Sequence, residues 1–168
     1  HMNCESISLE GVNIQKYFIT DTLFISSLDV NRISLDTRTA GDIKPKPSKV
    51  APLMHKWFRS LPGYHDVKKV RITNGDLKFT MLYDKATQSG TLHLRNINAT
   101  VDRITNLNKR FVTTVKGYAS YQGQNNLNLL VKIPVNDPNY KFMLKGDARS
   151  IDLPELNHFI QPMQLKFL

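Results

Sequence analysis

The sequence predicts a mainly β fold, in which a curled antiparallel sheet forms an open groove beside one principal amphipathic helix. The sheet is predicted because apolar and polar side chains alternate from Thr91 to Ala148, with turns too short to hold a long helix. The helix is predicted because apolar residues recur at helical spacing over Lys49–Leu61. A sheet with one apolar face needs a cover for that face, and the nature of this cover is the functional question.

Composition limits the class of protein. The 168 residues suffice for one domain, and residues 3–168 are expected to form a single β-rich domain or a piece of a longer protein, with His1 and Met2 a cloning remnant. The single cysteine, Cys4, excludes an internal disulfide and a multi-cysteine metal site. No apolar run reaches the roughly 18 residues that cross a bilayer. The net charge of +9 is scattered between apolar positions, which is typical of a solvated sheet face; weak attraction to anionic lipid or other polyanions is the alternative.

Short strands are expected in the N-terminal third. Ser6–Val12 offers a first strand, and Thr22–Leu35 offers two more. Asp36–Pro47 is polar and contains Gly and Pro, so it is predicted to be a loop. Two apolar triplets also share one spacing: Ile25, Leu28 and Val30, and Val67, Val70 and Ile72. This faint repeat favours a growing sheet of repeated hairpins over a small closed barrel.

The principal helix is predicted over Lys49–Leu61. Ser48 is suited to cap it, and Pro62 ends it. Three apolar residues on its stripe are candidates to cover the groove: Leu53, Trp57 and Phe58. A short second helix is also expected over Leu153–Ile160, because Pro154 suits a first helical turn.

Extended structure resumes at Lys68–Ile72. Asn74-Gly75 follows and is predicted to be the tight turn of a hairpin, because this dipeptide is the strongest short-range hairpin signal. Within Thr91–Val101 the apolar residues change from even-numbered to odd-numbered positions. A β-bulge near Arg95-Asn96 is therefore predicted, since one extra residue keeps both apolar sets on one face.

The predicted sheet is too wide for the predicted helix to cover. Six or more strands span roughly 30 Å, whereas a helix of a dozen residues is about 18 Å long and about 10 Å across. The uncovered face must curl on itself, pack on a neighbouring segment or hold an apolar ligand. The residues expected to line the groove are Leu77, Phe79, Met81, Leu92, Leu94, Ile97, Phe111, Val115, Leu129, Val131, Ile133, Phe142 and Leu144.

The sequence offers no motif for catalysis, and neither a cofactor nor a metal is expected. It has no G-x-S-x-G elbow, no P-loop and no G-x-G-x-x-G, and no two histidines have the spacing of a helical metal pair. Asp84 ends a strand without a second acid at a useful spacing. Nucleic acid is not expected, because Phe79, Phe111 and Phe142 fall with the aliphatic residues and not with Lys and Arg.

Four segments of the second half carry a shared pattern. A strand, an N-G turn and a strand begin at Val70, and alternating leucines begin at Leu92. Paired strands across a turn begin at Val131, and a connecting segment begins at Ser150. This pattern resembles the AsmA-like proteins of Gram-negative bacteria, and the resemblance is best over Val67–Leu168.

The resemblance implies a periplasmic protein whose parent is anchored in the inner membrane. It also implies a long curled sheet whose hydrophobic groove carries phospholipid towards the outer membrane, without catalytic residues. The leading hypothesis is thus a non-enzymatic envelope module that binds an acyl-chain ligand. The alternatives are a structural or interaction module that docks neighbouring segments of the parent chain, and an enzyme acting on envelope glycans, which lacks paired carboxylates.

Overall fold

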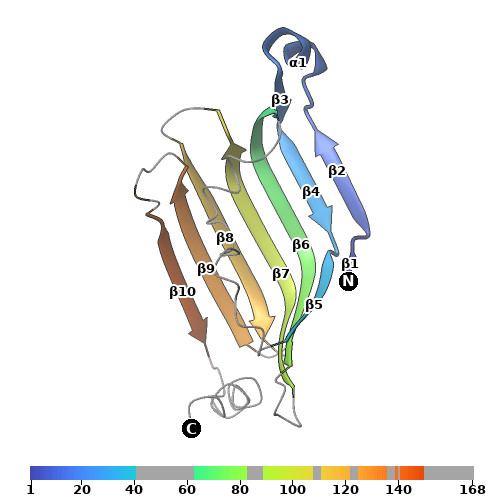
Figure 1. Ribbon diagram of the computed structural model, residues 1–168, viewed down its shortest axis with the longest axis vertical. Helices are drawn as coiled ribbons and strands as arrows, with labels where there is room; N and C mark the ends of the chain where they lie inside the picture. The colour runs from blue at the N-terminus through green and yellow to red at the C-terminus, as the bar shows by residue number, and fades with distance from the viewer. Residues whose placement is uncertain are drawn as a thin grey trace.

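The computed structural model shows one ten-stranded sheet that is curled and open (Figure 1). The structure describes residues 1–40, 63–82, 89–107, 111–121, 125–135, 139 and 141–149. Within these ranges β10 (Met143–Arg149) pairs only with β9 (Asn125–Pro134), and β2 (Ser6–Glu10) pairs only with β4 (Ser27–Asn31). The predicted fold class, a mainly β curled sheet that leaves a groove open, is confirmed.

The second half of the chain forms an antiparallel meander. The strands β6 (Tyr64–Leu82), β7 (Gly90–Thr105) and β8 (Val112–Tyr121) pair in order and continue into β9 and β10. Each neighbour in the sheet is the next strand in sequence, as the short turns predict.

The first half of the chain lies along the other edge of β6. The strands β3 (Thr22–Ile25), β4 and β5 (Ser34–Ala40) follow one another along β6, and each runs parallel to it. Antiparallel pairing therefore describes β6 to β10, and the sheet as a whole is mixed. Residues 41–63 join β5 to β6, which exceeds the dozen residues that a parallel crossover needs.

The apolar triplets seen in the sequence pair with one another. Ile25 lies opposite Val67, Leu28 opposite Val70 and Val30 opposite Ile72. The shared spacing therefore places the two triplets opposite each other on neighbouring parallel strands, and does not mark the successive hairpins that it suggested.

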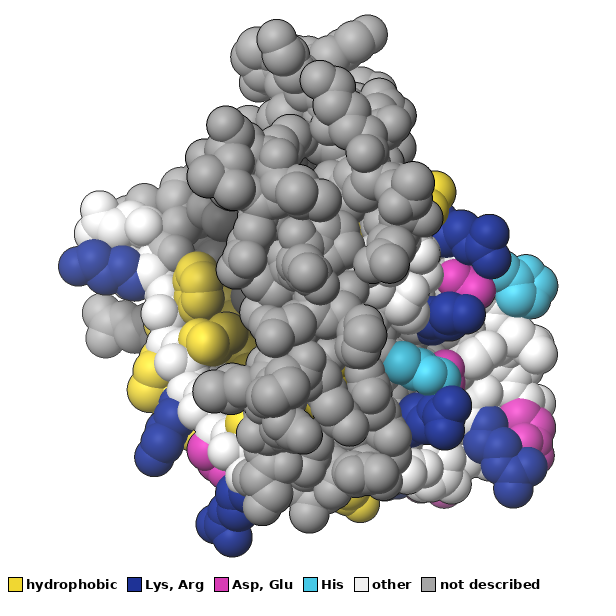
Figure 2. Space-filling model, turned by 90° about the horizontal axis from the view of Figure 1, so that it is seen from below, with side chains coloured by type: hydrophobic (Ala, Val, Ile, Leu, Met, Phe, Trp, Pro, Cys, Tyr) yellow, Lys and Arg dark blue, Asp and Glu magenta, His cyan; other side chains and the backbone are white. Residues whose placement is uncertain are grey.

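The strand registers separate the sheet into two faces. The bulk of the apolar residues of β6 to β10 are opposite one another across neighbouring strands, which defines the apolar face: Val70, Ile72, Leu77, Phe79, Met81, Leu92, Leu94, Ile97, Ala99, Val101, Val115, Ala119, Leu127, Leu129, Val131, Ile133 and Leu144. Lys, Arg, Asn and Thr occupy the alternating positions of the polar face. Seen from below in Figure 2, charged and histidine side chains fill much of the right of the view, and hydrophobic ones show mainly on its left.

A line of backbone irregularities crosses the sheet. Arg32, Asn74 and Asn96 have positive φ angles of 49°, 55° and 51°. The register between β6 and β7 shifts twice here, first by an extra residue in β6 and then by an extra residue in β7. The bulge predicted at Arg95-Asn96 is confirmed, because β7 also carries an extra residue against β8 between Arg95 and Asn98.

The hairpin predicted at Asn74-Gly75 is wrong, because β6 runs through both residues without turning. Asn74 uses its tolerance for positive φ to form a bulge instead of a turn. Gly75 is needed for close approach, since a Cβ there would lie 3.1 Å from the Cβ of Ile97.

The only helix among the described residues, α1 (Ile14–Thr20), was not predicted. Ile14, Tyr17 and Phe18 stand at helical spacing, but all three are exposed, and none of its seven residues is buried. Asn13 caps it through a 2.7 Å bond from the backbone N–H of Lys16, and Asp21 ends it in a left-handed conformation. The helices predicted over 49–61 and 153–160 lie outside the described residues. The loop predicted from Asp36 begins too early, since β5 extends to Ala40.

The tightest core lies near the end of β9. Val131 and Ile133 are buried and pack with Ile104 and Val115. Tyr121 is also nearly inaccessible. No helix of the described residues is long and apolar enough to span a membrane.

Near the start of β6, a buried histidine makes stability depend on pH. Thr105 Oγ1 donates to the backbone carbonyl of His65 at 2.9 Å, and the buried His65 Nε2 has no hydrogen-bond partner among the described residues. Burial lowers the pKa of His65 below 6.5, although a backbone bond with Gly63 and the charge of Asp66 oppose this. Because the unfolded state then binds the proton more readily, the contribution of His65 to stability is present above pH 6.5 and is lost as the pH falls below 6.5 towards the lower pKa of the folded state.

We therefore expect the free energy of unfolding to decrease between pH 7.5 and pH 5.5. Urea titrations at the two pH values measure the decrease, and His65→Phe should remove part of it. His93→Gln is the control, because His93 pairs with Asp76 at 2.8 Å on the polar face and does not share the buried surroundings of His65. An equal decrease in wild type and His65→Phe would contradict the prediction.

Candidate functional site

The candidate site is a hollow of about 500 Å³ on the apolar face. It lies over β6 to β10, and large side chains form its walls: Leu77, Leu94, Ile97, Val115, Leu127 and Leu129. A hollow of this size falls within the range of ligand sites in proteins.

Small residues create the hollow. Ala99, Gly117 and Gly146 lie in one cross-strand row with Leu129. Ala119 and Ala148 lie in the neighbouring row, on either side of Leu127. Since these five positions carry one carbon of side chain or none, the sheet surface is recessed between the larger residues around it. A Cβ on Gly117 would lie 3.3 Å from that of Ala99, so the two strands also need a small residue there to approach closely.

The structure places eleven of the thirteen predicted lining residues on the apolar face, and five of them line the hollow: Leu77, Leu94, Ile97, Val115 and Leu129. Phe79, Met81 and Leu92 continue the same face along β6 and β7. Leu129 and Leu144 are 43% and 61% exposed, so apolar surface reaches the open edge at β10.

Four of the predicted lining residues lie in the core or precede their strands, so they do not line the hollow. Val131 and Ile133 lie on the expected face, but they are 5% and 0% exposed and so pack within the core. Phe111 precedes β8, and its ring lies under the guanidinium of Arg103 at 3.6 Å. Phe142 precedes β10 and is exposed. The predicted cover residues Leu53, Trp57 and Phe58 lie outside the described residues.

The sequence reading missed the residues that shape the hollow. Only large apolar side chains were considered as lining, whereas Ala99, Gly117 and Gly146 set its depth. They could have been found from their place in the alternating pattern, because each occupies a position of its strand that faces the apolar side.

The polar face carries an ion-pair network between the two halves of the sheet. Arg71 on β6 makes a bidentate contact with Asp29 on β4, in which Nη2 donates to Oδ2 at 2.7 Å. Ser27 joins the network by donating to Asp29 at 3.2 Å. The hydrogen bonds from Arg71 hold the pKa of Asp29 below its usual range. This pair fixes the parallel register, in which Asp29 and Arg71 are direct neighbours.

Metal chemistry has no visible basis in the described part of the chain, where no three His, Cys, Asp or Glu side chains converge. No family model, curated protein or solved structure matches the chain. The hollow and the surfaces around it are therefore interpreted from their own geometry.

Proposed function

We propose that the apolar face holds the acyl chain of a phospholipid, in a non-enzymatic module that holds or conducts lipid. The hollow of about 500 Å³ carries this proposal, because apolar side chains and backbone line nearly all of it. Burial of an alkyl chain in such a site contributes about 0.8 kcal/mol per methylene group. The open edge at β10 would let a chain enter from the side.

The strand pattern that resembles AsmA-like proteins supports the cellular setting of this proposal. In that setting the protein faces the periplasm, its parent is anchored in the inner membrane, and the ligand is phospholipid in transit between the membranes. The polar face, with its alternating Lys and Arg, would stay in water while the apolar face is filled.

Filling the hollow should prevent lipid binding. Gly146 lies on the apolar face, and a Cβ there meets only ordinary contacts, at 3.5 Å to Asn128 O and 3.9 Å to Leu129 Cδ1. Gly146→Phe is therefore expected to fold and to occupy the space of at least two methylene groups. We expect about tenfold weaker binding of a fluorescent phosphatidylethanolamine, and less phospholipid in extracts of the purified protein by mass spectrometry.

Lys145→Phe is the matched control, since the same ring is added to the same strand on the polar face. It should bind the phospholipid as wild type does. Wild-type protein free of lipid and unable to bind the probe would overturn the proposal, as would equal binding by both variants.

A second candidate function is the docking of a neighbouring segment of the parent chain. It is favoured by β10, whose residues are all exposed and whose outer edge has no partner among the described strands. A lipid-free protein that binds the adjacent parent segment, and loses that binding in Gly146→Phe, would favour it.

A further inference from the structure

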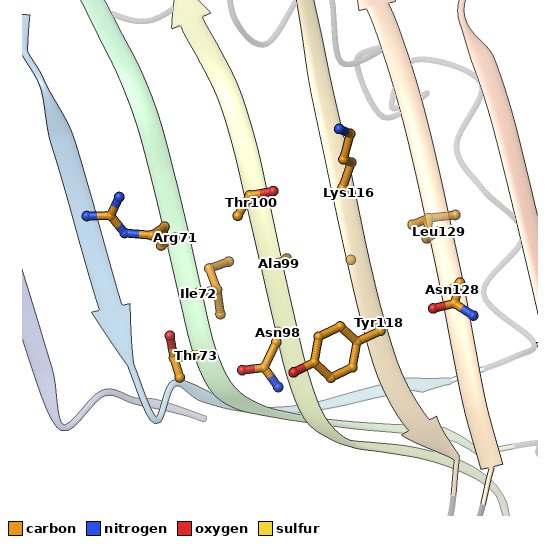
Figure 3. A pocket seen from close by; sticks show the side chains of 11 residues that line it. Arg71, Ile72, Thr73, Asn98, Ala99, Thr100, Lys116, Tyr118, Asn128 and Leu129 are labelled. Atoms are coloured by element: carbon orange, nitrogen blue, oxygen red, sulfur yellow. The ribbon is translucent and has the colours of Figure 1, made fainter.

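A second hollow, of about 470 Å³, lies on the polar face over β6 to β9 (Figure 3). Polar side chains from four strands surround it: Arg71, Thr73, Asn98, Thr100, Lys116, Tyr118 and Asn128. Ile72, Ala99, Gly117 and Leu129 also line it. It shares five lining residues with the lipid site: Ala99, Gly117, Tyr118, Asn128 and Leu129. Tyr118 and Asn128 alternate along their strands with Gly117 and Leu129, so the two hollows open on opposite faces of the sheet.

Tyr118 forms the platform of this hollow. It lies directly between Asn98 on β7 and Asn128 on β9 in the strand register. Its ring extends across the sheet towards Asn98, and its face is turned outward (Figure 3). The side chain is 53% exposed, and its hydroxyl has no hydrogen-bond partner among the described residues. An aromatic face is thus offered to a ligand with polar groups at its rim.

Some of the polar groups around Tyr118 already make hydrogen bonds within the sheet, and others are available to a ligand. Asn128 Nδ2 donates to Asp147 at 3.0 Å, which orients the amide and leaves its carbonyl oxygen free to accept. Asn98 is fixed by two bonds of the bulge, to Asn96 O at 2.8 Å and from the N–H of Asn74 at 3.2 Å. The hydroxyl of Thr100 makes no bond within the described part of the chain. The hollow therefore offers both donors and acceptors in fixed positions.

The charge of the hollow is positive. Arg71 is neutralised by its bidentate contact with Asp29. Lys116 is exposed on the same side, and no carboxylate of the described residues pairs with it. One available cation beside an aromatic platform suits a ligand that carries a single negative group on a ring.

We infer that this hollow binds an acidic saccharide. The C–H face of a pyranose ring would cover Tyr118, its hydroxyls would bond with Asn128 and Thr100, and its carboxylate would pair with Lys116. A single-stranded nucleic acid fits less well, because it needs several aromatic platforms for successive bases, and Tyr118 is the one aromatic side chain among the described residues that line this hollow.

Two hexasaccharide probes test the inference by titration calorimetry on the full chain. One is a hyaluronan hexamer, which carries carboxylates, and the other is a neutral N-acetylglucosamine hexamer. We expect the acidic probe to bind more tightly. Tyr118→Ala should weaken binding of both probes at least tenfold, whereas Lys116→Ala should weaken only the acidic one.

Tyr64→Ala is the matched control, because Tyr64 is 56% exposed and lies outside the hollow. It should leave both affinities unchanged, and thermal melts should show that all variants fold. Absence of binding to both probes, or equal binding by Tyr118→Ala and wild type, would overturn the inference. Tighter binding of an oligothymidine that Tyr118→Ala abolishes would assign nucleic acid instead and also overturn it.

Discussion

Deletion of Asn74 alone is expected to destabilise the sheet more than deletion of Arg32, Asn74 and Asn96 together. Asn74 is the extra residue of β6 that the extra residue of β7 offsets, so the two strands share one register on both sides of the bulges. Without it, Val70, Ile72, Leu77 and Phe79 still share one face, because the deletion makes the alternation of β6 continuous. The extra residues Arg32 and Asn96 then have no counterpart in β6, so β6 is one residue short of both of its neighbours across the bulge. Thermal melts followed by circular dichroism should show a lower melting temperature than wild type.

The matched variant deletes Arg32, Asn74 and Asn96 together. Arg32 stands beside Asn74, where its backbone N–H donates to the Thr73 carbonyl at 2.9 Å, and Asn96 is the extra residue of β7. The triple deletion restores continuous pairing of β5, β6, β7 and β8. We expect it to melt at a higher temperature than the single deletion. A triple deletion that melts no higher than the single one would show that the three irregularities do not compensate one another.

Replacing Ile133 with alanine is expected to lower the free energy of unfolding by about 2–5 kcal/mol. Ile133 is 0% exposed and packs in the cluster with Val131, so the change removes buried methyl groups and leaves a cavity. Urea unfolding would measure the loss, with circular dichroism at 218 nm as the signal, because this wavelength reports β structure. For a sheet with a small described core, this is a large part of a typical domain stability of about 5–15 kcal/mol.

Leu129→Ala is the control on the same strand and the same face. Leu129 is 43% exposed at the hollow, so its truncation should cost less than half as much as that of Ile133. Equal losses at the two positions would mean that the hollow is as tightly packed as the core, which would also weaken the lipid proposal.

The meander was predictable because its signals are local. Alternation fixed the two faces of β7, β8 and β9, and the phase slip near Asn96 located a bulge that the register confirms. Such signals require only that one side chain in two be apolar. The same reasoning placed Leu77, Leu94 and Leu129 together at the hollow.

The other features could not be predicted, because they depend on residues far apart in the sequence or on positions that look alike in an alternating pattern. Parallel and antiparallel neighbours leave the same alternating pattern, so the pairing of β3, β4 and β5 with β6 could not be predicted from it. Asn74-Gly75 favours positive φ in a bulge as well as in a turn. Tyr118 was missed because the aromatic residues considered were those of the apolar face.

The mixed pairing around β6 also bears on how the chain folds. The meander from β6 to β10 forms by contacts between consecutive strands, whereas β3, β4 and β5 reach β6 only after residues 41–63 have closed a loop. Loop closure must precede the contacts that reward it. The C-terminal strands should therefore form a template first, and the N-terminal strands should add to its edge in a later, slower step.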